Sequence, residues 1–515
     1  MTNFLSFPFF REPKLKVLFV GAEAAPFGKA GGLGSVTFSL TKALEGRDVD
    51  VRMMIPRYAS IDPLKFRLAM EYEGLEVPTD AKEEGEPRSL VCNVKKFTPV
   101  THNELEPVTT YFLENQEYYE KRVNIYGYSD DATRFALFSR GTLEFLRMSK
   151  WRPDIIVASD WQTGFLLNYL RTTYQHDERL NGIATVFIIH NLFYQGMFDH
   201  RFISEADFDD GRSPVPSLLS PRLAKMNAMR RGILYADAIT TVSPTYAHEI
   251  MEPEQGEALH ELLRERRPHV HGILNGIDYR EFDPNTDAYL KERYGRDSLE
   301  RRAKNKIDLQ DRFSLKKDPD AFVCMVNGRL VEQKGIDLLM PIAEPLFHEL
   351  PLQLVVSGMG EPRYMTFFQE LEKKFPGRVA ANFVFDPAIP HAMYGGGDAI
   401  LIPSKFEPSG LTQMEAMRYG VIPIVRATGG LADTVHDFHP GKGIGDGFVF
   451  HDFEPTALLI AIVRAYENFK HPGVWHGLQH RAMAKDFSWG KSAIHYRNLF
   501  EEALILHLRS KKAAV

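Results

Sequence analysis

Short apolar runs alternate with amphipathic segments along almost the whole chain. In the first half, apolar runs occupy residues 14–23, 48–56, 154–160, 183–191 and 236–243. Most of their positions are apolar, as is typical of strands covered on both faces of a parallel sheet. Segments with helical periodicity, such as "SVTFSLTKALEG" and "GFLLNYLRTTY", lie between them. The alternation predicts an α/β domain with a parallel sheet.

The same alternation restarts in the second half of the chain. The strand-like runs are 320–330, 352–358, 379–385, 398–404 and 421–427. Each half has the size of one doubly wound, Rossmann-like domain. The turn-rich stretch "HGILNGIDYREFDPNTD" separates the halves. We therefore predict four parts: a leader (1–13), an N-terminal domain (14–272), a C-terminal domain (273–484), and a final segment (485–515) whose long amphipathic helix packs back on the N-terminal domain.

Composition narrows the class of protein. A chain of 515 residues is too long for one core. With 44% hydrophobic and 25% charged residues it is typical of a globular protein, and its net charge of -6 predicts neither a nucleic-acid nor a membrane partner. The leader lacks the basic start and cleavage site of a signal peptide. Cys92 and Cys324 lie in apolar runs and are expected to be buried, inert thiols, which fits a cytoplasmic protein.

A glycine-rich loop follows the first predicted strand. Its sequence "FGKAGGLG" places Lys29 ahead of Gly31, Gly32 and Gly34. This spacing fits neither the dinucleotide fingerprint nor the P-loop, so a nicotinamide dehydrogenase is disfavoured. Glycines let a backbone approach a ligand closely, and a helix N-terminus favours an anion. A tight turn with a solvated lysine accounts for the local pattern equally well.

Polar residues that could take part in binding or catalysis follow two later strands of the first half. Asp160 ends the run 154–160, where it could either cap the next helix or act on a ligand. His190 and Asn191 end the run 183–191, and a lone histidine there can also be structural. Ligands of open α/β sheets bind beyond the carboxyl ends of the strands. If both sheets present these ends to each other, their loops line one cleft.

The second half repeats this arrangement with charged residues. Arg329 and Lys334 follow a predicted strand and could clamp an anion, the first as a planar fork and the second as a point charge. Glu407 precedes Ser409, which could cap a helix opening at Gly410. A third glycine turn, "TGGLADT", opens a short helix at residues 428–434. Solvated loops and a carboxylate favoured by a helix dipole are the competing interpretations.

Taken in order, these motifs resemble the glycogen and starch synthases. The matching stretches include "KAGGLG", "YSDDATRFALFSRG", "IHNLFYQGMF", "YADAITTVSPTYAHEI", "GRLVEQKGIDLL", "PSKFEPSGLTQMEAMRYG" and "TGGLADTV", and they extend from about Lys14 to the last helix. The resemblance implies a GT-B fold with the site in the cleft between its domains. It implies transfer of glucose, usually from ADP-glucose, to the non-reducing end of an α-1,4-glucan such as glycogen, with retention of configuration.

The resemblance also implies roles for individual residues. Arg329 and Lys334 correspond to the pair that neutralises the diphosphate, and Glu407 to the carboxylate facing the donor sugar, as a nucleophile or an electrostatic stabiliser. His190 corresponds to the histidine beside the reacting sugar, and Asp160 to the acid near the acceptor. The implied substrate-binding positions are Lys29, Gly31, Gly32, Gly34, Asn191, Tyr194, Phe385, Ser409, Gly410, Leu411, Thr412, Thr428, Gly429 and Gly430.

The sequence departs from the family pattern at several positions, and these departures bear on nucleotide preference and on how the acceptor is bound. Ser35, Ser159, Gln162 and Ser409 stand where the family usually has other residues, and Phe385 stands near its usual base-stacking aromatic. The phosphate-binding positions are intact, and side-chain cations make a metal cofactor unnecessary. The alternatives are a related transferase that uses UDP-glucose or another acceptor, and a glucan-binding homologue without activity.

Overall fold

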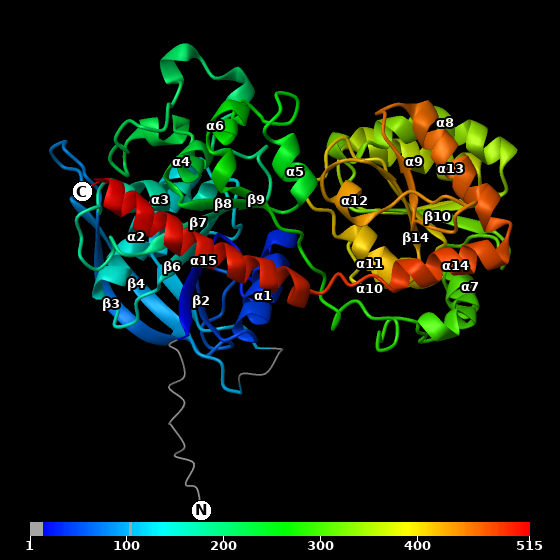
Figure 1. Ribbon diagram of the computed structural model, residues 1–515, viewed down its shortest axis with the longest axis horizontal. Coiled ribbons are helices and arrows are strands. Elements are labelled where there is room, and N and C mark those ends of the chain that lie inside the picture. Colours follow the sequence, from blue (N-terminus) through cyan, green and yellow to red (C-terminus); the bar gives the residue numbers. More distant parts are fainter. Residues whose placement is uncertain (1–13, 102–105, 515) are drawn as a thin grey trace, which may run out of the picture. The chain divides into compact units, whose positions relative to one another are not determined.

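The computed structural model describes residues 14–101 and 106–514, so the predicted leader lies outside the described residues. It contains two compact units. The first unit comprises the residues up to Ile239, Glu261–His269 and the residues from Ala493 onward. The second unit comprises Thr240–His260 and Val270–Ser492. Each unit is an α/β structure built on its own sheet (Figure 1).

The larger sheet, most of which lies in the first unit, has nine strands in the order β3-β4-β5-β2-β1-β6-β7-β8-β9. The strands are β1 (Leu15–Val20), β2 (Val49–Pro56), β3 (Ala69–Pro78), β4 (Ser89–Phe97), β5 (Thr110–Glu114), β6 (Ile155–Ser159), β7 (Ala184–Ile189), β8 (Ala238–Thr241) and β9 (Val270–Gly272). β1 pairs in parallel with β2 and β6, and β6 pairs in parallel with β7. β7 is buried at every position, as its continuous apolar sequence predicts.

The predicted strands of the first half are confirmed, but one hairpin was missed. β3 and β4 pair antiparallel at the edge of the sheet, and β4 pairs antiparallel with β5. The mostly exposed stretch Asp80–Arg88 connects β3 to β4. Most positions of β3 are exposed, so its sequence lacks the apolar run that marks the other strands.

Helices of the first unit pack against this sheet. They are α1 (Gly32–Glu45), α2 (Asp131–Met148), α3 (Gly164–Arg171), α4 (Ala228–Tyr235), α6 (His260–Glu265), and the short turns Gln116–Glu120, Trp161–Thr163, His200–Phe202, Glu205–Asp207, Pro221–Lys225 and Arg267–His269. α2 is buried along nearly its whole length. Cys92 on β4 is a buried free thiol, as predicted, and burial raises its pKa to about 12.

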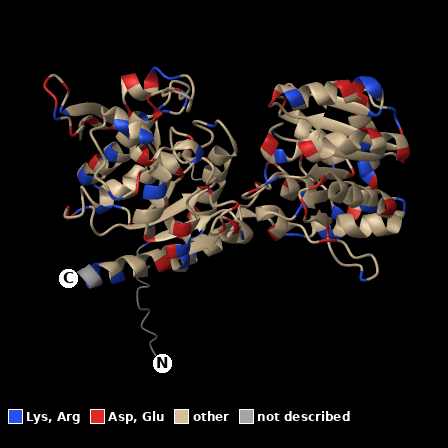
Figure 2. Cartoon of the chain, turned by 90° about the horizontal axis from the view of Figure 1, so that it is seen from above, with Lys and Arg blue, Asp and Glu red and all other residues tan. Residues whose placement is uncertain are grey.

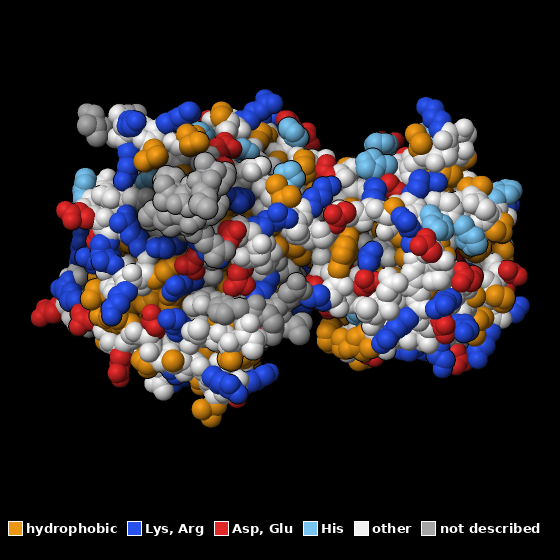
Figure 3. All heavy atoms as spheres, turned by 60° about the horizontal axis from the view of Figure 1, so that its bottom comes forward, with side chains coloured by type: hydrophobic (Ala, Val, Ile, Leu, Met, Phe, Trp, Pro, Cys, Tyr) orange, Lys and Arg blue, Asp and Glu red, His pale blue; other side chains and the backbone are white. Residues whose placement is uncertain are grey.

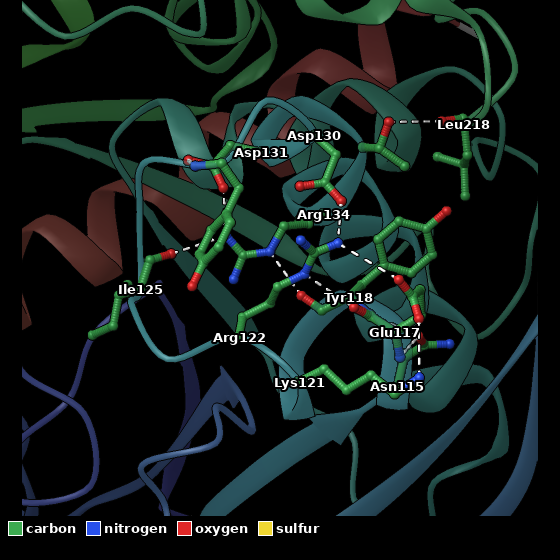
Figure 4. A network of polar contacts seen from close by, with 12 residues as sticks. Asn115, Glu117, Tyr118, Lys121, Arg122, Ile125, Asp130, Asp131, Arg134 and Leu218 are labelled. Atoms are coloured by element: carbon green, nitrogen blue, oxygen red, sulfur yellow. Dashed lines mark hydrogen bonds and ion pairs between the residues drawn. The ribbon is translucent and has the colours of Figure 1, made fainter.

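A buried arginine joins α2 to the loop before it. Arg134 pairs with Asp131 and donates to the backbone oxygens of Tyr118 (2.7 Å) and Ile125 (3.1 Å), as Figure 4 shows. Arg134 is fully buried, so each of these contacts compensates a charge removed from water. The "YSDDATRF" motif therefore has a structural role, because it fixes the loop that carries Tyr126.

The sheet of the second unit has six strands in the order β12-β11-β10-β13-β14-β15. The strands are β10 (Phe322–Asn327), β11 (Leu352–Ser357), β12 (Val379–Asn382), β13 (Ala399–Ile402), β14 (Ile422–Arg426) and β15 (Phe448–Phe450). All neighbouring strands pair in parallel. The order is that of a doubly wound sheet in which the winding reverses between β10 and β13, where ligands of such sheets bind.

Helices cover both faces of the second sheet. The helices and helical turns of the second unit are α5 (Pro244–Glu249), the turn Arg296–Arg301, α7 (Arg302–Arg312), the turn Glu332–Lys334, α8 (Ile336–Glu349), α9 (Pro362–Lys374), α10 (Ala388–Gly396), α11 (Thr412–Arg418), α12 (Gly429–Thr434), α13 (Pro455–Phe469) and α14 (Pro472–Met483). In Figure 1, α8, α9 and α13 lie on one side of the sheet, and α7, α10, α11 and α14 on the other. Cys324 on β10 is also a buried free thiol, and burial raises its pKa.

The last helix, α15 (Trp489–Ala514), belongs to both units. Near its start, the Ser492 hydroxyl donates to the backbone oxygen of Leu274 in the second unit (2.6 Å). Further along, Phe500 packs edge-on against Phe19 of β1, with ring centroids 6.4 Å apart, within the first unit.

Charged side chains of both signs are mixed over each unit. Figure 2 shows Lys and Arg alternating with Asp and Glu along the helices, and Figure 3 shows the same mixture on the surface it presents. None of the described helices is long and apolar enough to cross a membrane.

Candidate active site

In each unit, most of the predicted site residues follow three neighbouring strands. In the first unit these are β1, β6 and β7, and in the second unit β10, β13 and β14. Because parallel strands end at the same edge of a sheet, the loops after them lie close together. The structure thus gathers Lys29, Asp160 and His190 at one edge of the first sheet. It gathers Arg329, Lys334, Glu407 and Thr428 at one edge of the second.

A buried carboxylate holds the glycine-rich loop after β1. Glu23 accepts hydrogen bonds from the N–H groups of Ala30 (2.8 Å) and Gly31 (3.1 Å) and from the Tyr126 hydroxyl (2.7 Å). Lys29, Gly31 and Gly32 are exposed, and α1 begins at Gly32. Two N–H groups of the loop are thus used internally. The N–H groups of the first turn of α1, which have no intrahelical partner, can still meet an anion.

Asp160 does not cap the helical turn that follows it. Its Oδ1 instead accepts from the backbone N–H groups of His190 (2.8 Å) and Asn191 (3.4 Å), and its φ of 55° is strained for a residue other than glycine. Burial raises the pKa of Asp160 to about 7, although these N–H groups lower it. The capping interpretation was therefore wrong, and Asp160 holds the end of β7 in place.

Burial also decides the charge of His190. It lowers the pKa of His190 to about 4, so the imidazole is neutral at neutral pH. The next residues present polar and aromatic groups. Asn191 Oδ1 accepts from the Phe193 N–H (3.1 Å), and Tyr194 is half exposed, with its ring edge-on to Phe193. A neutral imidazole, an amide and an open phenol ring suit the hydroxyl groups and apolar faces of a sugar.

Lys334 and Glu407 form an ion pair at the edge of the second sheet. Lys334 Nζ lies 2.5 Å from Glu407 Oε2, and the Ser404 hydroxyl donates to the same oxygen (2.9 Å). Glu407 is only 6% exposed, so this pair compensates a nearly buried carboxylate. The sequence assigned the two residues to different parts of the substrate, and it gave no sign that they touch.

A small cavity of about 50 Å³ adjoins this ion pair. Its lining includes Arg329, Lys334 and Glu407 together with the start of α11. Arg329 is exposed, and its guanidinium lies 3.4 Å from Gln333 Oε1. Both predicted cations therefore border one space, which is the arrangement that an anion clamp requires.

The helix after Glu407 begins later than the sequence predicts. α11 starts at Thr412 rather than Gly410, because Gly410 turns the chain with a φ of 63°. Ser409 was expected to cap this helix, but its buried hydroxyl has no hydrogen-bond partner among the residues described. The predicted cap is thus wrong. The N–H groups at Leu411, Thr412 and Gln413 open α11, where they lack intrahelical partners and border the cavity.

The turn Thr428–Gly430 uses its donors within the protein. The Thr428 hydroxyl (3.0 Å) and the Gly429 N–H (3.1 Å) donate to the carboxylate of Glu249. The Gly430 N–H donates to the backbone oxygen of Glu407 (3.0 Å), and the Leu431 N–H donates to that of Thr428 (3.0 Å). The resemblance implies substrate binding by Thr428, Gly429 and Gly430, and the structure gives the donors named here partners within the protein.

Phe385 offers an exposed aromatic ring beyond β12. It is 85% exposed, and its neighbour Val384 is 72% exposed. An unpacked ring at the carboxyl end of a strand is free to stack on a flat ligand such as a nucleobase.

Three hydrogen-bonding partners were not identified from the sequence: the acceptors Glu23 and Glu249, and the donor Ser404. All three lie in or beside the motifs quoted above, but their local sequence gave no indication of what these residues do. In the part of the chain that the structure describes, no three His, Cys, Asp or Glu side chains come together as metal ligands.

Comparison with known proteins identifies the class to which this fold and site belong. Residues 16–265 match the family model of the starch synthase catalytic domain, and residues 307–475 match that of the group 1 glycosyl transferases. Two Rossmann-like units that match these models define a glycosyltransferase of the GT-B type. The predicted fold class and enzyme class are confirmed.

Relatives extend the match over nearly the whole chain. Glycogen synthase from Moorella thermoacetica is 41% identical over 493 residues, covering 95% of this chain and 97% of the relative. Glycogen synthase from Anaeromyxobacter sp. is 40% identical and covers 94% and 99%. The catalytic domain of starch synthase IV from Arabidopsis thaliana is 31% identical, with a TM-score of 0.81 over 95% of this chain and 99% of that one. The chain belongs to the glycogen and starch synthase family.

Proposed function

We propose that this protein transfers glucose from ADP-glucose to the non-reducing end of an α-1,4-glucan, with retention of the anomeric configuration. The observation that carries the proposal is the cavity shared by Arg329, Lys334 and Glu407. The solved starch synthase IV domain is bound to ADP and acarbose, which supports a nucleotide and a glucan-like ligand for its relatives.

The second unit supplies the groups that act on the leaving diphosphate. As the bond from glucose to phosphate breaks, negative charge grows on the phosphate oxygens. Arg329, Lys334 and the N–H groups at the start of α11 are placed to stabilise that charge. Such contacts strengthen in the transition state and therefore raise turnover. Because these cations are side chains, the reaction needs no metal ion in this proposal.

Glu407 acts as an electrostatic stabiliser in this mechanism rather than as a nucleophile. Its Oε2 already accepts from Lys334 Nζ and the Ser404 hydroxyl, and charge-assisted hydrogen bonds reduce the availability of an oxygen for attack. The sugar becomes oxocarbenium-like, so a fixed negative charge near it lowers the barrier. The departing phosphate accepts the proton of the attacking glucan hydroxyl.

The first unit contributes the sugar and acceptor side. A neutral His190 can donate a hydrogen bond to a sugar hydroxyl without placing a second positive charge near the oxocarbenium-like centre. Asp160 fixes the backbone of His190 and Asn191, and the exposed ring of Tyr194 can pack on a sugar face.

A donor panel tests the proposal. Glycogen is incubated with ADP-glucose, UDP-glucose or GDP-glucose, and both glucosyl transfer and released nucleoside diphosphate are measured. We expect transfer and release in equal amounts, with ADP-glucose the preferred donor. A preference for UDP-glucose would agree with the proposed reaction but contradict the proposal that ADP-glucose is the donor. Release of the nucleoside diphosphate without transfer to glycogen would contradict the proposal that an α-1,4-glucan is the acceptor.

A further inference from the structure

Glu249, at the end of α5, contacts a turn nearly 180 residues further along the chain. Its carboxylate accepts from the Thr428 hydroxyl and from the Gly429 N–H, which lies 3.1 Å from both carboxylate oxygens. Gln255 and Arg426 also interact with this carboxylate. Glu249 is only partly exposed, and it lies in the motif "YADAITTVSPTYAHEI", to which the mechanism above assigns no role.

A second carboxylate makes the reverse connection between the same two helices. Asp433 of α12 accepts from the Thr245 N–H (2.9 Å) and the Thr245 hydroxyl (2.7 Å), at the start of α5. Each helix thus supplies a carboxylate that satisfies N–H and hydroxyl donors at the start of the other. Two such contacts fix both the distance and the rotation of α5 against α12.

The turn held by Glu249 is packed directly against the loop of Glu407. The Gly430 N–H donates to the Glu407 backbone oxygen at 3.0 Å. A side chain on Gly429 would place its Cβ 2.0 Å from that same oxygen, and one on Gly430 would place its Cβ 1.8 Å from the Ser409 oxygen. The two glycines therefore serve close packing of one loop on another, which any shift of the turn would disturb.

We propose that Glu249 is a positioning residue that fixes Glu407 through the Thr428–Gly430 turn. The turn then acts as a support for the Glu407 loop and does not contact the diphosphate. Glu249 lies in the segment Thr240–His260, which clusters with the second unit although the residues before and after it cluster with the first. The proposal rests on the proposed function, because it assigns Glu407 to the transfer reaction.

The test compares four single variants for turnover with saturating ADP-glucose and for ADP affinity by calorimetry. In Glu249→Ala the support is lost, and we expect kcat to fall by roughly 10- to 100-fold, since a shift of about 1 Å in a catalytic group has this scale of effect. ADP affinity should change by less than about threefold, because Arg329, Lys334 and α11 remain in place. Glu249→Gln keeps an acceptor oxygen and should recover most of the turnover. Glu254→Ala, which removes an exposed glutamate of the same segment, should behave as wild type.

Thr428→Val separates support from direct phosphate binding. If the turn only supports the Glu407 loop, Thr428→Val should lower kcat and leave ADP affinity unchanged. A supporting role also predicts that Thr428→Val adds little to Glu249→Ala, since Glu249→Ala already removes the hydrogen bond from the Thr428 hydroxyl. A loss of about tenfold or more in ADP affinity, equivalent to about 1.4 kcal/mol, would show that the turn holds the diphosphate and would overturn the proposal.

Amide hydrogen exchange of the segment 428–431 gives a readout that does not depend on transfer. We expect faster exchange in Glu249→Ala, and wild-type exchange in Glu249→Gln and Glu254→Ala. Unchanged exchange in Glu249→Ala would overturn the proposal even if turnover fell. If wild type transferred no glucose, the proposed function would fail, whereas the exchange result would still decide whether Glu249 holds the turn.

Discussion

Lys334 Nζ and Glu407 Oε2 lie 2.5 Å apart, so the cation predicted for the diphosphate and the carboxylate predicted for the sugar form one ion pair. The pair adjoins the cavity that Arg329 also borders. In the proposed mechanism, the growing charge on the leaving phosphate competes with Glu407 for Lys334. When Lys334 shifts its contact from Glu407 to the phosphate in this mechanism, the carboxylate becomes free to stabilise the positive charge that develops on the sugar.

Replacing Glu407 by glutamine tests its role as a stabiliser. Glu407→Gln keeps the size and one acceptor oxygen but removes the charge, so we expect kcat to fall by roughly 10²–10³ with ADP affinity retained or increased. Increased affinity is expected because Lys334 loses its competing partner. Steady-state kinetics measures kcat, and calorimetry measures ADP affinity. Glu370→Gln, at an exposed site of α9, is the matched control. Full turnover in Glu407→Gln would contradict the assignment.

The His190 assignment predicts a separation of kcat from donor affinity. In the proposed mechanism the neutral imidazole acts on the sugar, so His190→Ala should lower turnover much more than it weakens ADP binding. Kinetics with ADP-glucose and calorimetry with ADP give the two quantities. A hundredfold weaker ADP affinity with unchanged turnover would place His190 on the nucleotide instead.

The raised pKa of Asp160 predicts a pH-dependent effect on stability. Burial holds the folded pKa at about 7, against 3.8 for an ordinary Asp, so the folded state binds the proton more tightly. This contribution to stability is fully present below about pH 4 and is lost as pH rises through about 7. Asp160→Asn removes a buried charge only at the higher pH. Its melting temperature relative to wild type should therefore be higher at about pH 8.5 than at about pH 5.5. The same difference at both values would contradict the assigned pKa.

Removal of divalent ions tests the proposal that side chains alone neutralise the diphosphate. Turnover should survive dialysis against EDTA, because Arg329 and Lys334 provide the positive charge. The assay compares initial rates before chelation, after it, and after Mg²⁺ is returned. Near-complete loss that Mg²⁺ restores would show that the cations are insufficient.

The sequence predicted the strands well where they are continuous apolar runs. β10 and β7 are buried at nearly every position, and such runs have few alternatives to a central parallel strand. β3 failed this criterion because most of its residues are exposed, so its pairing with β4 depends on the neighbouring chain rather than on its own pattern.

The side-chain partners within the site could be predicted less well than its location. Strand ends indicated where Arg329, Lys334 and Glu407 lie, because doubly wound sheets bind ligands there. The contacts of Lys334 with Glu407 and of Glu249 with Thr428 join residues 73 and 179 positions apart. Such contacts depend on how loops and helices pack in three dimensions, which local patterns do not encode. The same limit explains the wrong cap at Ser409, since it depends on the turn at Gly410.

The central claim is that Arg329 and Lys334 together neutralise the leaving diphosphate, and their removal tests it most directly. Turnover is measured with saturating ADP-glucose for Lys334→Ala, Arg329→Ala, the double variant and Lys334→Arg, with the exposed Lys316→Ala as control. We expect each alanine variant to lose roughly 10²–10³ in kcat, as is typical for one donor of a preorganised site. The double variant should lose less than the product, because both residues serve one group. Lys334→Arg should not restore full activity, and Lys316→Ala should match wild type. If both single alanine variants kept more than half of the wild-type turnover, the clamp and the mechanism built on it would be wrong.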